Sequence, residues 1–444
     1  MSYPLSSEVI VGQATEAAQY NNLRSDALYL GGASGASGTV RDLLYSAAGV
    51  YSLTQVGKTM IRLDASDTSP VGLMIGGTIY SVAASVSLTL TTTLLPAAGR
   101  YPVYAIGQSD GTFNLSLSGG QNSRAVGACC WDGTGIIPGT LRTTAEAALK
   151  AAVKRPDAAS GRLSLVSGDP CPDTDIDQAE ILYFMPFRGN EIALHLFGAW
   201  EYFNFSAISL AKSGMINGMP YDIFLTADSD GLSLEAMSWG SSTARPAGTL
   251  QYVDGIRVSG SYAEKRYLGT VALNDAGYFE DSKTGRLVWN ENNRLARPII
   301  SRLLTTRSQG TSHMNAWAPY YDDDAPQVRL LVPLGDCEFE LTGIGLSSPI
   351  SESDRGYQQA AAVGIGKDIL MESPYTGNKS CSLAGTHGFG NGPMIAETEN
   401  TGSDFAGYHV YTLVFWSNYS FYPAGTNLAD VTGLWPGLYG SIKG

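Results

Sequence analysis

Charged side chains are scarce in this chain of 444 residues. Asp, Glu, Lys and Arg together make up 16% of it, whereas roughly 25% is usual in soluble domains. Acidic residues outnumber basic ones by 41 to 28, which gives a formal net charge of −13. Proteins that follow the phosphates of nucleic acids rely on a broad cationic surface, so we expect no nucleic-acid partner.

Histidine and cysteine are few and scattered. None of the four histidines has a metal-ligand partner at i+2, i+3 or i+4, and the five cysteines contain no C-x-x-C pair. Neither a zinc site nor a disulfide framework is therefore predicted. Cys129 and Cys130 precede Trp131 in a strand-like run, where buried thiols pack as small hydrophobic groups. The chain also lacks a P-loop and a dinucleotide-binding fingerprint ahead of a helix, and we predict no enzyme, no cofactor and no metal.

Long apolar runs are missing as well. No segment approaches the 18 or so consecutive apolar residues that a membrane-spanning helix requires. The opening MSYPLSSEVIVG lacks the basic and then apolar regions of a secretion signal. We expect synthesis in the cytosol without a signal peptide, and no membrane insertion.

Glycine and tyrosine are abundant, with 52 and 24 residues, and with Ser and Thr they are typical of short strands joined by tight turns. Helical patterns are limited to residues 11–30 and 143–153. Alternation of apolar and polar residues, the period of a half-buried strand, predicts strands at several places. These are residues 85–91, 101–106, 113–117, 192–196, 221–226, 232–239, 266–273, 328–333, 337–341 and 408–416. The pattern predicts a mainly β protein with several small antiparallel β-sandwich or jelly-roll-like domains in series after a short N-terminal helix.

The chain is longer than one hydrophobic core usually serves, and its composition divides it into five segments. They are an N-terminal arm with a helix and a Gly/Ser linker (1–38), a small β domain (39–142), a helical connector (143–175), a β-sandwich domain (176–296) and a C-terminal β domain (297–444). The small and polar residues of the first helix leave two interpretations open. They suit close packing around a symmetry axis, and they equally suit an ordinary short helix or arm.

Three parts of the chain resemble proteins of tailed bacteriophages. Residues 12–14 (GQA) with Tyr20, Asn21, Asn22, Leu23 and Arg24 resemble the N-terminal segment by which phage tail and fibre proteins attach to the particle. A longer pattern is similar to phage structural and tail-appendage proteins: residues 266–270 (RYLGT), then Asp281 and Ser282, then residues 286–290 (RLVWN) and onward to Arg294. The glycine-rich ending, residues 437–444, fits the same class.

The resemblance implies a virion-docking site and a structural motif. The docking residues that it implies are Gln13, Tyr20, Asn21, Asn22, Leu23 and Arg24. The residues of the structural motif are Arg266, Tyr267, Gly269, Trp289, Asn290 and Arg294. From the residues themselves, we expect Trp289 in a core, with the guanidinium groups bonded to turn carbonyls or carboxylates.

The resemblance further implies a homotrimeric tail fibre or tail appendage, located in the virion and serving host attachment. Its partners would be further copies of itself, other tail or head proteins, and a host surface glycan or protein. Two alternatives stay open. One is a head fibre or capsid decoration protein; the other is a polysaccharide-depolymerising tail spike, a class that usually needs a long repetitive β-helix, and we find no such repeat.

Several clusters have both a functional and a plain structural interpretation. Asp322, Asp323 and Asp324 form either a cation site or a solvated turn. Residues 228–231 (DSDG) resemble the start of a calcium loop, but the twelfth position is Trp239 instead of Glu. His195 is expected on a half-buried strand. Two aromatic groups are candidates for sugar-stacking platforms, although core or interface packing is the default: Trp200, Tyr202, Phe203 and Phe205, and then Trp416, Tyr419, Phe421 and Tyr422.

Overall fold

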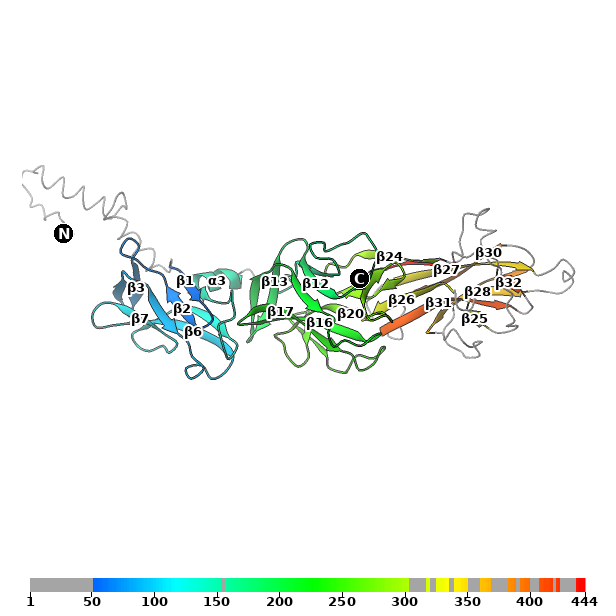
Figure 1. Cartoon of the computed structure of the whole chain (residues 1–444). Helices are drawn as coiled ribbons and strands as arrows, with labels where there is room; N and C mark the ends of the chain where they lie inside the picture. Colours follow the sequence, from blue (N-terminus) through cyan, green and yellow to red (C-terminus); the bar gives the residue numbers. More distant parts are fainter. Residues whose placement is uncertain are drawn as a thin grey trace, which may run out of the picture. The chain divides into compact units, whose positions relative to one another are not determined.

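The protein is mainly β, with several small antiparallel sheets (Figure 1). The computed structural model describes residues 51–152, 156–302, 317–319, 325–334, 339–349, 360–368, 382–388, 392–399, 407–417, 421–423 and 437–443. Strands make up 58% of it, with almost no helix, so the predicted fold class is confirmed at this level. The sandwich and jelly-roll details stay predictions. The expected N-terminal helix and the linker at 31–38 lie outside the described residues.

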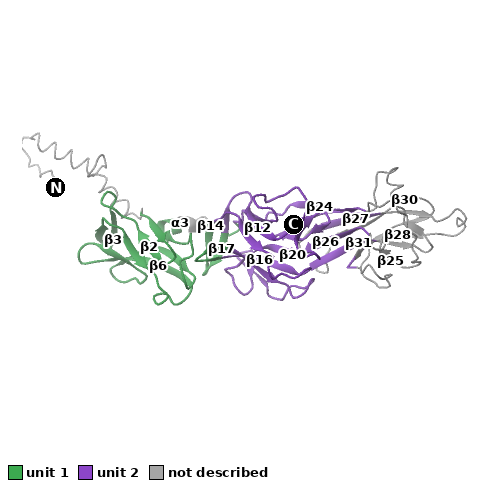
Figure 2. Ribbon diagram, viewed as in Figure 1, with its two compact units in different colours: residues 1–157, 193–203, 227–232 green, residues 158–192, 204–226, 233–444 purple. Residues whose placement is uncertain are grey.

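The chain forms two compact units (Figure 2). Unit 1 consists of Met1–Asp157, Ala193–Phe203 and Ala227–Leu232. Unit 2 consists of Ala158–Ile192, Asn204–Thr226 and Ser233–Gly444. The finer division into five segments stays a prediction.

Unit 1 is built from short antiparallel strands. One sheet has the order β1 (Leu53–Val56), β2 (Met60–Leu63), β5 (Val86–Thr89), and a hairpin joins β3 (Val71–Ile75) to β4 (Thr78–Val82). Another sheet has the order β7 (Phe113–Ser116), β6 (Gly99–Gly107), β8 (Ser123–Trp131), β9 (Arg142–Thr143). The ribbon of β13 (Glu191–Leu196) and β14 (Ala199–Asn204) supplies residues 193–203. Strands predicted at 85–91, 101–106 and 113–117 are confirmed.

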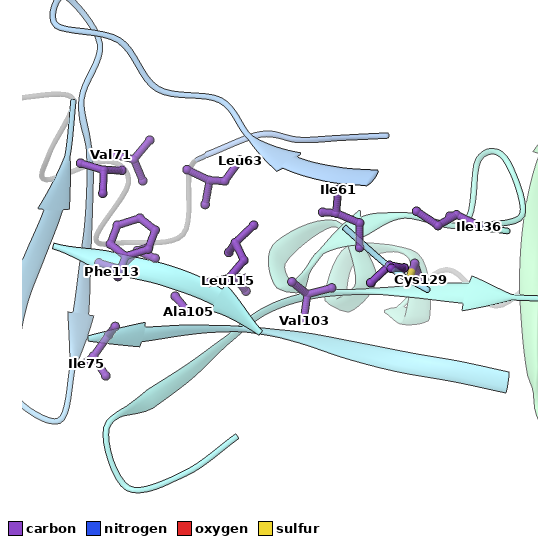
Figure 3. Close-up of a cluster of buried hydrophobic side chains, with 14 of the residues drawn as sticks. Ile61, Leu63, Val71, Ile75, Val103, Ala105, Phe113, Leu115, Cys129 and Ile136 are labelled. Atoms are coloured by element: carbon purple, nitrogen blue, oxygen red, sulfur yellow. The ribbon is translucent and has the colours of Figure 1, made fainter. Parts of the chain in front are cut away.

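The core of unit 1 follows the two-residue period of its strands. In β2, Ile61 and Leu63 are fully buried, whereas the intervening Met60 and Arg62 are half-buried. Phe113 of β7 lies in the same cluster as Ile61 and Leu63 (Figure 3). Alternate side chains therefore line one face of each short strand and exclude water between the sheets.

Helix α3 (Thr144–Ala152) confirms the helix predicted at residues 143–153. It begins with a reciprocal capping box. The Glu146 carboxylate accepts a hydrogen bond from the Thr143 backbone N–H at 2.8 Å, and the Thr143 hydroxyl accepts one from the Glu146 N–H at 3.2 Å. Two backbone donors that a helix start leaves without partners are thereby satisfied, and the alanine-rich sequence that follows favours the helix.

The described residues of unit 2 form four sheets, and their strands include those predicted at 221–226, 232–239, 266–273, 328–333 and 408–416. One sheet has the order β10 (Gly161–Ser164), β12 (Ile181–Pro186), β15 (Ile208–Ala211). Another has the order β17 (Gly231–Ser238), β16 (Pro220–Asp228), β20 (Arg266–Ala272), β19 (Ile256–Ser259), β18 (Leu250–Val253), with β23 (Val288–Asn290) also paired to β20. A third has the order β11 (Ile176–Ala179), β21 (Phe279–Ser282), β22 (Gly285–Arg286), β26 (Gln327–Val332), β31 (Gly407–Ser417), β28 (Ala360–Lys367), β29 (Ser382–Gly388), with β25 (Trp317–Pro319) on β31. The fourth has the order β24 (Ala296–Arg302), β33 (Gly437–Lys443), β27 (Phe339–Pro349), β30 (Gly392–Glu399), with β32 (Phe421–Pro423) on β27.

The glycine-rich end of the chain is an interior strand of the fourth sheet. β33 pairs antiparallel with β24 on one side and β27 on the other. A Cβ at Gly440 would lie 2.0 Å from the backbone oxygen of Glu340. Glycine therefore allows the backbones to approach closely at this position.

Candidate functional site

The predicted docking residues, Gln13, Tyr20, Asn21, Asn22, Leu23 and Arg24, lie outside the described residues. So do Asp322, Asp323 and Asp324, and the side chains of the second aromatic group, Trp416, Tyr419, Phe421 and Tyr422.

The first aromatic group, at residues 200–205, lies within the described residues. Phe203 and Phe205 are each 6% exposed, and Phe205 stacks on Phe184 with ring centroids 4.8 Å apart. These two phenylalanines are core residues and offer no surface for a sugar.

The motif of residues 266–270 and 286–294 is brought together by two neighbouring strands of unit 2. Thr270 of β20 lies opposite Trp289 of β23, and Gly269 lies opposite Asn290. Trp289 is 1% exposed, and its ring stacks on that of Tyr267 with centroids 6.4 Å apart. Residues about 20 positions apart in the sequence thus form one buried aromatic cluster.

Polar side chains of the motif hold the strand β10. The Asn290 amide oxygen accepts a hydrogen bond from the Leu163 N–H at 2.6 Å. The Asn293 amide donates to the carbonyls of Ala159 and Gly161 at 2.8 and 3.0 Å. Arg266, which is 1% exposed, donates to the Ala158 carbonyl at 3.0 Å. Buried polar groups are costly unless they are bonded, so these side chains fasten β10 and the residues just before it to the motif.

A buried ion pair lies beside the aromatic cluster. Asp222 of β16 is fully buried, and its two oxygens accept hydrogen bonds from Nε and Nη2 of Arg245 at 2.8 and 2.9 Å. Oδ1 also accepts from the Trp239 indole N–H at 3.0 Å and from the Thr270 hydroxyl at 2.7 Å. The guanidinium carbon of Arg245 lies 4.5 Å from the centroid of the Trp239 ring. Both carboxylate oxygens are occupied, so Asp222 has a structural role in this arrangement.

Glu280 of β21 is a second carboxylate of this kind. It is 1% exposed. Its Oε1 accepts from the Ser282 hydroxyl at 2.7 Å and from Nη2 of Arg329 at 3.1 Å, and its Oε2 accepts from the Asn274 amide at 3.1 Å. Glu280 is bonded on both oxygens, as Asp222 is, and it serves the packing of its sheet.

A chain of contacts leads from Trp289 to the surface. The guanidinium of Arg294 lies over the Trp289 ring, 4.3 Å from its centroid, and Nη2 contacts the Glu291 carboxylate at 3.4 Å. Glu291 in turn accepts two hydrogen bonds from Nη1 of Arg257, at 2.7 and 2.8 Å. Nε of Arg257 donates to the phenol oxygen of Tyr252 at 2.8 Å. Tyr252 is 63% exposed, so the motif supports an aromatic side chain at the surface.

A similar arrangement lies where β17 approaches the connection between β19 and β20. Nζ of Lys265 donates to both carboxylate oxygens of Glu235, at 2.8 and 2.6 Å, and lies 4.7 Å from the centroid of the Tyr262 ring. Tyr262 is 56% exposed. Sequence reasoning missed both tyrosines. We call Tyr252, Tyr262, Arg257, Lys265, Glu235 and Glu291 the tyrosine face.

No protein-family model and no curated protein matches this chain. Its candidate site is therefore defined by the contacts of its own residues, and the tyrosine face is the part of it that reaches solvent. Arg257 holds Tyr252 and is bonded to Glu291, which contacts Arg294, and Arg294 in turn lies over the Trp289 ring.

The described histidines and cysteines have structural surroundings. Burial raises the pKa of Cys129 and of Cys130 to about 12, so both thiols stay protonated at neutral pH. The ring of His195 packs edge-on to Trp200 with centroids 5.3 Å apart. His409 is 2% exposed and pairs with Asp368 at 2.7 Å. Within the described ranges, no three His, Cys, Asp or Glu residues are grouped as a metal site, and no helix is long and apolar enough to cross a membrane.

Two sequence patterns that suggest chemistry form hairpin turns in unit 1. Residues 107–111 (GQSDG) have the G-x-S-x-G spacing of a hydrolase nucleophile, but they connect β6 to β7, whereas that nucleophile requires a strand-to-helix turn. Residues 228–231 (DSDG) lie between β16 and β17. There the Asp230 N–H donates to Asp228 at 2.8 Å, and the Asp230 carboxylate pairs with Lys58 at 2.5 Å. This turn uses its carboxylates for local bonds.

The same turn is fastened to Asp132, which makes unit 1 sensitive to acid. Burial raises the pKa of Asp132, but N–H donors of Thr134, Gly135 and Ser229, at 2.6, 2.8 and 2.7 Å, outweigh it and hold the pKa well below the usual range. The pKa of Asp132 is lower in the folded protein than in the unfolded chain, where an aspartate has a pKa near 4. The ionised carboxylate therefore stabilises the fold above about pH 4, and this stabilisation is lost as the pH falls below that value.

We expect Asp132→Asn to lower the free energy of unfolding of unit 1 by about 1–3 kcal/mol at pH 7, because an amide is a weaker acceptor for these donors. The difference from wild type should shrink as the pH falls below 4. Thermal unfolding followed by circular dichroism from pH 7 to pH 2 measures it. The exposed carboxylate of Asp67 provides the control variant, Asp67→Asn. A difference between wild type and Asp132→Asn that does not change with pH would contradict the assignment.

Proposed function

We propose that this chain is a structural subunit of a tailed-phage particle, a homotrimeric tail fibre or tail appendage. It docks through its N-terminal segment and presents its β domains for attachment to the host surface. The observation that carries the proposal is the phage-like motif of residues 266–270 and 286–294. Its sequence, which includes Trp289, Asn290 and Arg294, resembles a pattern of phage structural proteins. Low charge and high strand content suit such a subunit, since sheets with few charges pack against one another at low desolvation cost.

The contacts of the motif support a passive, non-enzymatic role. Asp222 and Glu280 are bonded on both oxygens, and Glu291 is held by two arginines. General acid–base chemistry needs a carboxyl group that can reach a substrate proton. In a particle with several copies of the chain, weak individual contacts would add up to firm attachment.

The proposal predicts that the chain is found on purified phage particles. Antibodies against unit 1, detected with gold in the electron microscope, should label the tail of the phage that encodes the chain, and mass spectrometry of the same particles should detect its peptides. Light scattering of the purified chain should give about 141 kDa, three times the chain mass of 47.0 kDa.

Each result has a distinct meaning. Label on the head instead of the tail would favour a head fibre or decoration protein. Particles that carry neither label nor peptides would contradict the proposal altogether. A monomer in solution, with label on the tail, would contradict only the trimer. Reducing ends released from host capsular polysaccharide by the purified chain would replace the passive role with that of a depolymerising tail spike.

A further inference from the structure

Two aromatic rings of unit 2 face solvent although they are fixed in place, one on strand β18 and one in the connection between β19 and β20. Among the described residues, Tyr252 and Tyr262 are the aromatic side chains with more than half of their surface exposed, at 63% and 56%. Exposed tyrosine side chains normally change rotamer freely, and fixing them costs entropy. Contacts that already fix a ring therefore prepare it for binding.

Tyr252 is fixed through its hydroxyl group. Nε of Arg257 donates to the phenol oxygen at 2.8 Å, and Arg257 itself is held by the bidentate contact of its Nη1 with Glu291. The side chains of Arg257 and Glu291 are only 16% and 17% exposed. The support is thus largely buried, whereas the ring that it orients is in water.

Tyr262 is fixed through its ring. Nζ of Lys265 lies 4.7 Å from the ring centroid and is bonded to both oxygens of Glu235. A cation at this distance is attracted by the electrons of the ring. Each tyrosine therefore has a cation beside it, and each cation has a carboxylate.

The strand register relates the positions of Arg257 and Lys265. Val258 of β19 lies opposite Arg266 of β20, and both are buried. Successive side chains of a strand point to opposite faces. Arg257, the residue before Val258 in β19, therefore projects from the other face, and Lys265 immediately precedes β20. Tyr252 lies opposite Arg257 and shares its face.

The two supports are close together. The N–H of Ser259 donates to the Lys265 carbonyl at 2.9 Å, so these two residues are neighbours across the ladder, and Arg257 is two residues along from Ser259. With strands about 4.8 Å apart and a rise of about 3.3 Å per residue, the Cα atoms of Arg257 and Lys265 are roughly 8 Å apart. The two supporting cations are therefore neighbours on the ladder.

The tyrosine face carries almost no net charge. Arg257 and Lys265 are balanced by Glu291 and Glu235, and Arg294 adds one positive charge beside Glu291. A strongly anionic ligand such as a phosphorylated or sulfated polymer would need unpaired cations. A ligand with apolar C–H faces and neutral hydroxyl groups fits better. The tyrosine rings can stack on the C–H faces, and carboxylates and guanidinium groups can form hydrogen bonds with the hydroxyl groups.

We propose that the tyrosine face binds a neutral oligosaccharide, with one sugar ring stacked on Tyr252 and another on Tyr262. Glu235, whose side chain is 40% exposed, accepts hydrogen bonds from sugar hydroxyls. Arg257, itself held by Glu291, keeps Tyr252 in its binding orientation. The inference rests on the proposed function, since attachment to a host surface is the setting in which a glycan is the ligand.

Saturation-transfer NMR tests the inference with the full-length chain. The probes are neutral oligomers of glucose, galactose, N-acetylglucosamine and rhamnose, and calorimetry then measures the affinity of those that bind. We expect at least one probe to bind, with the strongest transfer to ring C–H protons. Tyr252→Ala and Tyr262→Ala should each weaken binding by about tenfold or more. Tyr252→Phe keeps the ring and should weaken it by less than about threefold.

Ile216→Ala is the matched control, because Ile216 belongs to the same unit and is 61% exposed. It should bind the oligosaccharide as wild type does. Absence of binding by all four probes, or equal affinities for wild type and both alanine variants, would overturn the inference. If Tyr252→Ala instead lowered the oligomer mass in light scattering without changing glycan affinity, the face would be a subunit contact and the inference would be wrong.

The virion and glycan experiments can fail separately. If gold labels the particle but the chain binds no glycan, the glycan site is wrong and the proposed function still stands. If the chain binds glycan but is missing from the particles, the proposed function is wrong and the glycan site still stands.

Discussion

Replacing Asp222 with alanine should lower the free energy of unfolding of unit 2 by about 3–5 kcal/mol, because the variant leaves the Arg245 guanidinium without its partner beside the core. Asp222 is fully buried, and the Arg245 side chain is 17% exposed. The indole N–H of Trp239 and the hydroxyl of Thr270 would also lose their shared acceptor. Urea unfolding of the full-length chain, followed by tryptophan fluorescence, measures the effect.

An exposed ion pair of the same unit provides the control for Asp222. Lys283 and Asp175 are 3.5 Å apart, and their side chains are 45% and 44% exposed. Lys283→Ala should therefore cost only about 0–1 kcal/mol. The double variant Asp222→Leu with Arg245→Met should recover much of the lost stability, since it removes both charges. A cost for Asp222→Ala no larger than that for Lys283→Ala would show that the buried pair is dispensable.

The strands were predictable because alternation is a local property. Residues 101–106 and 113–117 alternate clearly, and the structure places β6 and β7 there as a hairpin pair. The helix at 143–153 was predictable for the same reason, since its capping residues are adjacent to it in the sequence. The partners of each sheet were not predictable, because they join distant residues. The parallel pairing of β22 with β26, for example, brings Gly285 to Arg329.

The candidate site shows the same limit. Sequence reasoning weighed residues 200–205 as a sugar-stacking platform against core packing, its default, and Phe203 and Phe205, each 6% exposed, agree with the default. Tyr252 lies in the short strand L-Q-Y-V, where an aromatic residue between polar and apolar neighbours is as typical of a core as of a surface. Whether a strand face is covered depends on other elements of the fold. The support from Glu291, 34 residues from Arg257, could not be inferred from spacing.

The motif residues were singled out by resemblance alone, and for Gly269 the structure supplies a steric reason. All seven residues of β20 are buried, so no alternation marks its faces. Gly269 lies within it at φ +157°, opposite Asn290. A Cβ at this position would lie 2.1 Å from the backbone oxygen of Trp289 and 2.9 Å from Cδ1 of Leu163.

Gly269→Ala should therefore lower the free energy of unfolding of unit 2 by about 3 kcal/mol, because the backbones of β20 and β23 would have to separate. The separation would also disturb the packing of Trp289 on Tyr267, so near-ultraviolet circular dichroism should change along with the urea midpoint. Gly240→Ala is the matched control. Its Cβ would make an ordinary contact, 3.5 Å from the Ala244 carbonyl oxygen, and its stability should stay within about 0.5 kcal/mol of wild type. Equal stabilities of the two variants would mean that the close approach of β20 and β23 does not require glycine at position 269.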